Sequence, residues 1–388
     1  MSSNSISSRF NIKIDFEKSR GAYIHDKNTN KKYLDLFGMY SSLPLGYNNS
    51  IFGDEFNKEI KRVSQLKIVN CEILSDEYDS FMNSFREFAS MGGEYNNFHF
   101  ACTGALAVEA AIKTAMWYSG PSPTGQVLSL KNSFHGINSY GNILTTRFSG
   151  VSARLGDLPG ENLWEQCDTI SDMINLIKEG HPDTKGVIIE PIQATYGDNH
   201  LNIQDLKELR MVCTKYDVPL IFDEVQTGFC ASGKVWYSEK IGINPDIIIF
   251  GKKSQVSGIL VKNSHAKIFE DKGRLCVTFD GDLIDMIRCK YIISAVVNKN
   301  LLQNVEETGS IFLRSLRAME GISNPRGTGF LIAFDFETTE ERDQFVSRAF
   351  ENGVLCNPTG TRSIRLRPTL SFTKQDTANA IKIIRRSL

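Results

Sequence analysis

The sequence predicts an α/β protein built on a mainly parallel sheet, and three observations lead to this fold class. Short apolar segments alternate with amphipathic ones between residues 100 and 255. The apolar segments are continuous, which is typical of strands that are covered on both faces. The chain has 388 residues, enough for two or three domains with a large buried core.

The expected elements follow one another in a regular order. A hairpin is expected near the start, where residues 23–26 and 32–36 flank a polar turn. The alternating region is expected to hold helices at 104–117, 164–180 and 203–216 and strands at 126–130, 186–190, 218–223 and 246–250. After residue 285 a long helix leads into a smaller α+β part with strands at 329–334 and 363–367.

Composition excludes several classes of protein. The 44 basic and 45 acidic residues leave a net charge of −1, which argues against a dedicated nucleic-acid binder. No apolar run is long enough to span a membrane, and the Ser-rich start lacks the apolar stretch of a signal peptide. We therefore expect a cytoplasmic protein without membrane partners. The eight scattered cysteines contain no CxxC pair, which predicts buried reduced thiols and no metal site.

Polar residues follow four of the expected strands, at the edge where an open parallel sheet binds its ligands. They are Ser133-Phe134-His135-Gly136, Glu190-Pro191-Ile192-Gln193, Asp223-Glu224-Val225-Gln226 and Gly251-Lys252-Lys253. One edge of the sheet thus collects an aromatic ring, carboxylates, an amide and lysines. A lysine in such a place can form a Schiff base with a carbonyl compound, most often pyridoxal phosphate.

That cofactor places three demands on a protein. Its ring nitrogen needs a carboxylate, which Asp223 can supply at the end of the most apolar strand. Its phosphate needs backbone N–H groups, and Thr103-Gly104-Ala105 opens a helix with small residues. Its ring needs an apolar face, which Phe134 can supply. Each residue alone has an ordinary structural explanation, as a turn, core or hydrogen-bonding residue. Their combination in this order indicates a cofactor site.

Five motifs carry a resemblance to a known family. They are Gly104-Ala105-Leu106-Ala107-Val108-Glu109, Phe134-His135-Gly136, Ile189-Glu190-Pro191-Ile192-Gln193, Phe222-Asp223-Glu224-Val225-Gln226-Thr227-Gly228 and Phe250-Gly251-Lys252-Lys253-Ser254-Gln255. Together they resemble the class III (ornithine/GABA-type) aminotransferases, and within that class the L-lysine 6-aminotransferases.

The resemblance extends from about residue 20 to the C-terminus and implies fold type I of the pyridoxal-phosphate enzymes. That fold has a large domain with a mainly parallel seven-stranded sheet and a smaller α+β domain. Residues 49–285 would form the large domain and residues 286–388 the small domain. Residues 1–48 would form an N-terminal segment that joins the small domain.

The resemblance also implies a role for each matched residue. Lys252 matches the lysine that forms the Schiff base, and Asp223 matches the carboxylate that pairs with the ring nitrogen. Spacing alone does not exclude Lys253 as the Schiff-base lysine. The implied cofactor-binding residues, which cradle the phosphate, stack on the ring or lie beside its polar groups, are Gly104, Ala105, Phe134, His135, Glu190, Asp223, Gln226, Lys252 and Thr278.

Two of the matches concern the partner subunit and the substrate. Thr278 matches a threonine that reaches the phosphate of the other subunit, which implies a homodimer with shared active sites. Arg365 matches an arginine that binds a substrate carboxylate. The implied reaction moves the amino group of an amine, or the terminal amine of an L-lysine-like amino acid, to a keto acid such as 2-oxoglutarate. A non-catalytic relative, or another pyridoxal-phosphate reaction on the same fold, stays open.

Four positions depart from the family pattern. Thr195 stands where the family has a glutamate that pairs with the carboxylate-binding arginine. Ile137 stands where the lysine enzymes have an arginine that holds the substrate α-carboxylate. Asp280 and Asp282 replace a glycine and an asparagine after the threonine of the partner contact, which adds negative charge near the phosphate. Ile137 and Thr195 together predict a substrate that is shifted from lysine.

Overall fold

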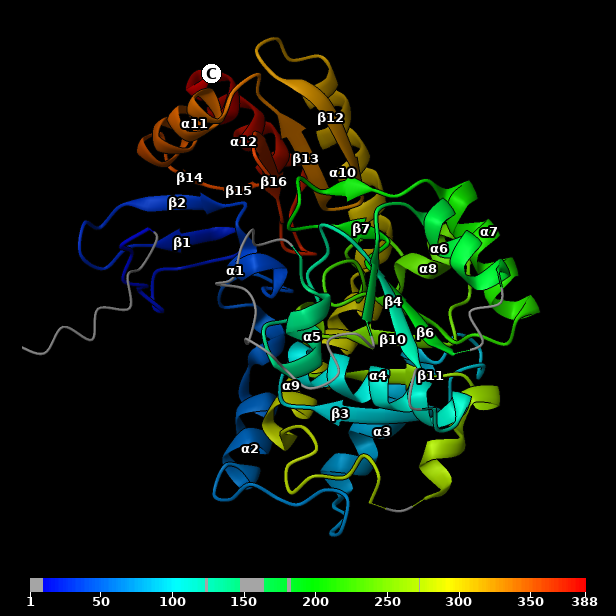
Figure 1. Cartoon of the computed structure of the whole chain (residues 1–388). Coiled ribbons are helices and arrows are strands. Elements are labelled where there is room, and N and C mark those ends of the chain that lie inside the picture. Colours follow the sequence, from blue (N-terminus) through cyan, green and yellow to red (C-terminus); the bar gives the residue numbers. More distant parts are fainter. Residues whose placement is uncertain (1–9, 123–124, 147–163, 180–182, 272) are drawn as a thin grey trace, which may run out of the picture.

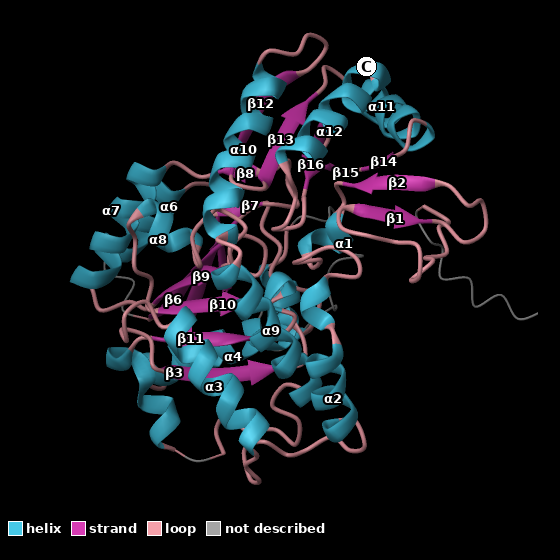
Figure 2. Ribbon diagram, turned by 180° about the vertical axis from the view of Figure 1, so that it is seen from behind, coloured by secondary structure: helices cyan, strands magenta, loops and turns pink. Residues whose placement is uncertain are grey.

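A computed structural model describes residues 10–122, 125–146, 164–179, 183–271 and 273–388. Within these residues the chain forms a seven-stranded sheet, a four-stranded sheet, a three-stranded sheet and a two-stranded ribbon. Figure 1 shows the two larger sheets at opposite ends of the molecule, and Figure 2 shows the same arrangement from behind. The predicted α/β class is confirmed.

The seven-stranded sheet is mainly parallel, as predicted. Its strand order is β3 (Asn97–Ala101), β11 (Ser257–Val261), β10 (Ile247–Phe250), β9 (Leu220–Asp223), β6 (Thr184–Ile189), β4 (Gln126–Leu130) and β5 (Trp164–Cys167). Strand β11 alone runs antiparallel to both of its neighbours. The carboxyl ends of β4, β6, β9 and β10 therefore lie at one edge.

Both faces of this sheet are covered by helices, which explains the continuous apolar strands. Ile188 and Ile221 face the cluster beneath α4 (Gly104–Ser119). Val187 and Leu220 face the opposite cluster, which is covered by α6 (Ile170–Lys178) and α7 (Ile203–Lys215). Neighbouring residues of one strand are thus buried on opposite sides.

Two predictions about this sheet need correction. The helix predicted at 164–180 is wrong at its start, because residues 164–167 form β5, which pairs in parallel with β4. The helix begins only at Ile170, where Thr169 and Asp172 form a capping box. Residue 180 lies outside the described residues. Strands β3 and β11 were not predicted, since β3 is half exposed and carries polar residues.

The C-terminal part contains the four-stranded sheet, here named the C-terminal sheet. Its strands, in order, are β12 (Ser323–Thr328), β13 (Leu331–Asp335), β16 (Ser363–Leu366) and β15 (Asn357–Thr359). Helices α10 (Leu301–Arg317), α11 (Thr339–Glu351) and α12 (Lys374–Ser387) accompany this sheet, whereas α9 (Leu283–Asn298) packs against α2 (Asp54–Val63) and α3 (Asp76–Ala89). The predicted long helix after 285 is therefore two helices, α9 and α10.

The N-terminal hairpin lies beside this C-terminal part (Figure 1). Strands β1 (Tyr23–His25) and β2 (Lys32–Asp35) pair as predicted, and β2 pairs in parallel with β14 (Val354–Leu355). The domain boundaries at 48/49 and 285/286 stay a prediction.

The other elements are α1 (Gly38–Ser41), η1 (Ser50–Phe52), α5 (Ser139–Leu144), β7 (Ile192–Gln193), β8 (Asn199–His200), α8 (Tyr237–Ile241), η4 (Lys252–Ser254) and η5 (Asn263–Glu270). Among the described residues, no helix has both the length and the apolar character that a membrane span requires.

The approach of α10 to the start of the C-terminal sheet depends on Gly309. A Cβ on Gly309 would lie 2.6 Å from the carbonyl carbon of Gly329. Replacing a helix glycine by alanine normally stabilises a protein by about 0.5–1 kcal/mol. We expect Gly309→Ala instead to lower the free energy of unfolding by about 1–3 kcal/mol, because the added methyl group meets backbone. Urea unfolding measures this, with the exposed Ser310→Ala on the same helix as control. A stabilised Gly309→Ala protein would contradict the packing.

Candidate active site

Two adjoining cavities lie at the carboxyl edge of the seven-stranded sheet. The smaller one, of about 250 Å³, is here named the inner cavity; Gly104, Ala105, His135, Ile137, Glu190 and Asp223 are among its lining residues. The larger one, of about 690 Å³, is named the outer cavity; Arg342 and Arg365 are among its lining residues. Phe134, Thr195, Gln226 and Lys252 line both. The structure therefore brings together every site residue predicted from the sequence except Thr278.

The turn after β10 places the two candidate lysines, Lys252 and Lys253, in different environments. Gly251 packs closely there, because a Cβ would lie 2.9 Å from the hydroxyl of Ser257. Lys252 follows with a left-handed φ of 51° and lines both cavities. Lys253 points elsewhere: its buried Nζ donates to the carbonyl of Pro368 at 3.4 Å. This placement favours Lys252 as the residue that reacts.

The pKa of Lys252 is lowered to about 8, mainly by burial; the charge of Asp223 opposes this shift, and the charge of Arg365 adds to it. At pH 7 about one tenth of such an amine is neutral, far more than for an ordinary lysine. Only the neutral amine is a nucleophile. The environment of Lys252 thus suits an amine that attacks a carbonyl near neutral pH.

A buried pair, His135 and Asp223, lies across the inner cavity. His135 Nδ1 is 2.8 Å from Asp223 Oδ2, and Asp223 Oδ1 accepts a hydrogen bond from the backbone N–H of Val225 at 3.1 Å. An ionised carboxylate only accepts, so Nδ1 is the donor. These contacts fix the orientation of the carboxylate that the resemblance assigns to the ring nitrogen.

Glu190 positions the aromatic residue. Its Oε1 accepts the backbone N–H of Phe134 at 2.7 Å. The pKa of Glu190 is raised to about 7, mainly by burial; His135 and Lys252 oppose this shift, and the charge of Asp223 adds to it. Phe134 is thereby held between the two cavities.

The start of α4, where the sequence predicts a phosphate cradle, has a geometry that suits one. The Thr103 hydroxyl caps the helix by accepting the N–H of Leu106 at 3.3 Å. Gly136 has a φ of 97°, and a Cβ there would lie 2.9 Å from that of Ala105. Because Gly136 has no side chain, the loop that contains it can approach the N-terminus of α4. That end of the helix carries a partial positive charge, which favours a phosphate.

Two buried polar atoms in this region lack a hydrogen-bond partner within the described residues. They are His135 Nε2 and the hydroxyl of Thr195, and both residues line the inner cavity. Buried polar groups are normally satisfied, so these atoms indicate a polar ligand. With a carboxylate, a helix N-terminus, an aromatic ring and a lysine around one cavity, the residues fit pyridoxal phosphate.

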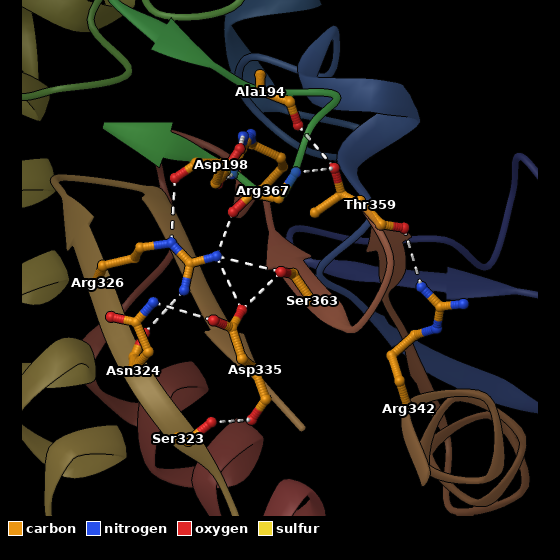
Figure 3. Close-up of polar contacts among 12 residues, drawn as sticks. Ala194, Asp198, Ser323, Asn324, Arg326, Asp335, Arg342, Thr359, Ser363 and Arg367 are labelled. Atoms are coloured by element: carbon orange, nitrogen blue, oxygen red, sulfur yellow. Dashed lines mark hydrogen bonds and ion pairs between the residues drawn. The ribbon is translucent and has the colours of Figure 1, made fainter. Parts of the chain in front are cut away.

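Sequence analysis missed the ion pair that holds Gln226. Arg367 and Asp198 are almost fully buried, with side chains 1% and 0% exposed, and they pair through two hydrogen bonds (Figure 3). Arg367 Nε also donates to Gln226 Oε1 at 3.2 Å. The amide NH₂ of Gln226 is therefore the end left for the cavities. The spacing of Arg365 in β16 and Arg367 just after it was the one available signal, since alternate residues of an extended chain point to the same side.

Arg365 and the residues that differ from the family pattern lie in different environments. Arg365 is buried and its Nη1 donates to the carbonyl of Ala194 at 2.7 Å. Ile137 is 61% exposed and lines the inner cavity. Thr278 is exposed and is not among the lining residues of either cavity. Its assigned contact with a partner subunit stays a prediction.

Asp280 and Asp282 have local structural roles, which the sequence did not suggest. Asp280 Oδ1 accepts the backbone N–H of Val277 at 2.9 Å. Asp282 caps α9 by accepting the N–H of Ile284 at 2.8 Å, and its other oxygen lies 3.3 Å from Nζ of Lys67. Both carboxylates therefore stabilise the loop and helix on which they lie.

The cysteines are not all buried, which corrects the expectation. Cys71, Cys102 and Cys276 are exposed in this chain, and the other five are buried. The sulfur atoms of Cys71 and Cys276 and a carboxylate oxygen of Asp280 lie within 4.8 Å of one another. Sequence spacing did not reveal this cluster, since 205 residues separate the two cysteines.

Similarity to known proteins shows which family the chain belongs to. The model of the family described as aminotransferase class-III matches residues 6–388, and the chain therefore belongs to this family of pyridoxal-phosphate enzymes. It is 29% identical to the L-lysine-epsilon aminotransferase of Amycolatopsis lactamdurans, over 98% of this chain and 92% of the relative. It is 30% identical to a 4-aminobutyrate aminotransferase of Dictyostelium discoideum, over 92% of this chain and 81% of the relative.

A solved structure leads to the same conclusion. The lysine aminotransferase from M. tuberculosis superposes with a TM-score of 0.92 at 27% identity, covering 100% of this chain and 96% of the other. The predicted fold, family, cofactor and enzyme class are confirmed: the protein is an aminotransferase.

The reactivity of Lys252 tests its environment. We expect reductive labelling of cofactor-free protein with a small aldehyde to occur at Lys252. Its rate should rise about tenfold per pH unit and level off near pH 8, because the neutral amine reacts and burial lowers its pKa to about 8. Peptide mass mapping at several pH values measures this. Preferential labelling of Lys253, or a rate still rising at pH 10, would contradict the assignment.

The pair of Asp198 and Arg367 gives a stability prediction. Asp198→Asn leaves a buried guanidinium without its counter-charge, so the free energy of unfolding should fall by about 3–5 kcal/mol. Adding Arg367→Met to Asp198→Asn should recover much of this loss, because the uncompensated charge is removed. Denaturant unfolding of both variants measures the effect. An Asp198→Asn protein as stable as the parent would show that the pair is not essential.

Proposed function

We propose that this aminotransferase uses Lys252 and Asp223 as its catalytic residues and acts on a carboxylate-bearing amine other than L-lysine. The observation that carries the proposal is the position of Lys252, with a lowered pKa, between an inner cavity that fits the cofactor and an outer cavity that can hold a substrate. A keto acid such as 2-oxoglutarate would accept the amino group.

When bound, pyridoxal phosphate supplies a carbonyl for amines and a ring that withdraws electrons from the neighbouring carbon. The start of α4, with Gly104 and Ala105, would hold the phosphate. Asp223, oriented by His135, would hold a proton at the ring nitrogen. The NH₂ group of Gln226 would donate to the phenolic oxygen. Lys252 Nζ would take a proton from the substrate carbon and return it one position away.

The departures at Thr195 and Ile137 support a changed donor. Without a glutamate at 195, no carboxylate at that position competes with a substrate carboxylate for the guanidinium of Arg365. Without an arginine at 137, the α-carboxylate of lysine loses its partner in the lysine-type position, and Ile137 offers apolar surface instead. Both changes disfavour lysine as the donor.

We further propose a homodimer in which Thr278 completes the partner's phosphate site. Its exposed position, away from both cavities of its own chain, supports this arrangement. The cytoplasmic location stays a prediction. Membership of the aminotransferase family favours an enzyme over the non-catalytic role that the sequence left open.

Absorption spectra with amines test the function. The protein with pyridoxal phosphate should show a visible band that Lys252→Ala alters, and a productive amine should convert the cofactor stoichiometrically to its amine form. Loss of the Lys252 proton transfer should slow turnover by about 10²–10⁴-fold. L-lysine should react poorly, and the double variant Ile137→Arg/Thr195→Glu should increase its rate.

Three outcomes would contradict the proposal. Fast turnover of L-lysine by the parent protein would disprove the changed donor. A visible band without conversion by any amine would favour the non-catalytic role. Conversion that continues unchanged in Lys252→Ala would exclude Lys252 as the catalytic lysine.

A further inference from the structure

The outer cavity is unusually cationic. Its charged lining residues within the described chain are Lys252, Arg342 and Arg365, and no carboxylate is among them. The other lining residues are aromatic or uncharged polar residues, glycine and proline. A cavity of this composition attracts anions, and its two arginines keep their charges when Lys252 is joined to the cofactor.

Arg342 is the cation that sequence analysis did not predict. It lies in the first turn of α11 and is only 8% exposed. Its Nη1 donates to the carbonyl of Gly360 at 3.3 Å, so the side chain reaches from the helix towards the loop after β15 (Figure 3). Gly360 also lines the outer cavity, so this contact holds the guanidinium at the cavity wall that the C-terminal part supplies.

The charge of Arg342 is only partly neutralised. Nε lies 2.6 Å from Oδ1 of Asp343, but that carboxylate is 61% exposed on its side chain, so water screens it. Nη2 makes no hydrogen bond to another described residue. Arg342 lines the outer cavity, and a planar guanidinium is suited to bind a carboxylate.

We propose that Arg342 binds a second substrate carboxylate, so that the preferred substrates are dicarboxylates held between Arg365 and Arg342. This inference rests on the proposed function and names its substrate class. The loss of an arginine at 137 removes a carboxylate partner beside the inner cavity, and Arg342 supplies one from the C-terminal part. One carboxylate would contact each arginine, while the reacting carbon faces Lys252.

Calorimetric titration of the cofactor-loaded protein with unreactive acids tests this proposal. Glutarate and adipate serve as dicarboxylates, and butyrate serves as the monocarboxylate. We expect Arg342→Ala to weaken the binding of at least one dicarboxylate by about 10–100-fold, the effect of one charge-assisted bidentate contact, and to change butyrate binding by less than about twofold. The kinetic counterpart is a raised KM for dicarboxylic substrates with kcat nearly unchanged.

Two further variants separate charge from structure. Arg348→Ala is the matched control, since Arg348 lies on the same helix but donates to the carbonyls of Ser387 and Leu388, away from the cavity. It should leave dicarboxylate binding unchanged. Arg342→Gln can keep a donor to Gly360 while removing the charge, so it should weaken dicarboxylates as Arg342→Ala does, even if the alanine variant folds poorly.

Equal weakening of butyrate and both dicarboxylates by Arg342→Gln, or no weakening of any acid, would overturn the proposal and leave Arg342 as a support for the 360 loop. Calorimetry needs no turnover. Selective loss of dicarboxylate binding in a protein that converts no amine would therefore keep this inference while the proposed reaction fails.

Discussion

Both cavities depend on how the loop at 194–198 is held against the C-terminal sheet. The Arg367–Asp198 pair anchors the end of the loop in the interior, where an unpaired charge would cost several kcal/mol. Thr359 accepts the N–H of Gly197 at 3.2 Å and donates to the carbonyl of Ala194 at 2.9 Å (Figure 3). Residues that are far apart in the sequence thereby form one wall, which carries Thr195 to the junction of the two cavities.

The negative and positive side chains around Lys252 lie at different cavities. Asp223 and Glu190 lie at the inner cavity, and Arg342 and Arg365 lie at the outer one. Lys252 stands between them, and its pKa reflects both groups as well as its burial. The inner end therefore suits a protonated ring, and the outer end suits an anionic substrate. This separation follows from topology, because strand ends supply the carboxylates and the C-terminal part supplies the guanidiniums.

The sequence predicted what local pattern and strand direction determine. Continuous apolar strands indicated a covered parallel sheet, and the residues after them met at its edge, as for Phe134, Glu190 and Asp223. Prediction from the sequence failed where the structure depends on contacts between distant segments of the chain. Strand β5 was read as a helix because only its pairing with β4 shows that it is a strand. The partners of the Asp198–Arg367 pair are 169 residues apart in the sequence. Which of Lys252 and Lys253 enters the cavities depends on the backbone conformation of the turn, where Lys252 has a left-handed φ.

The division of labour along the chain has a consequence for how such enzymes diversify. The residues assigned to the cofactor lie between 104 and 252, apart from Thr278. Ile137 and Thr195 lie in that same part, but both proposed substrate arginines, Arg342 and Arg365, come from a short later stretch. Inherited changes in that stretch can give a descendant a new substrate without disturbing the cofactor pocket. The limit on such drift is Arg367, which reaches back to Gln226. A lineage can therefore vary its substrate arginines more freely than the arginine that touches no substrate.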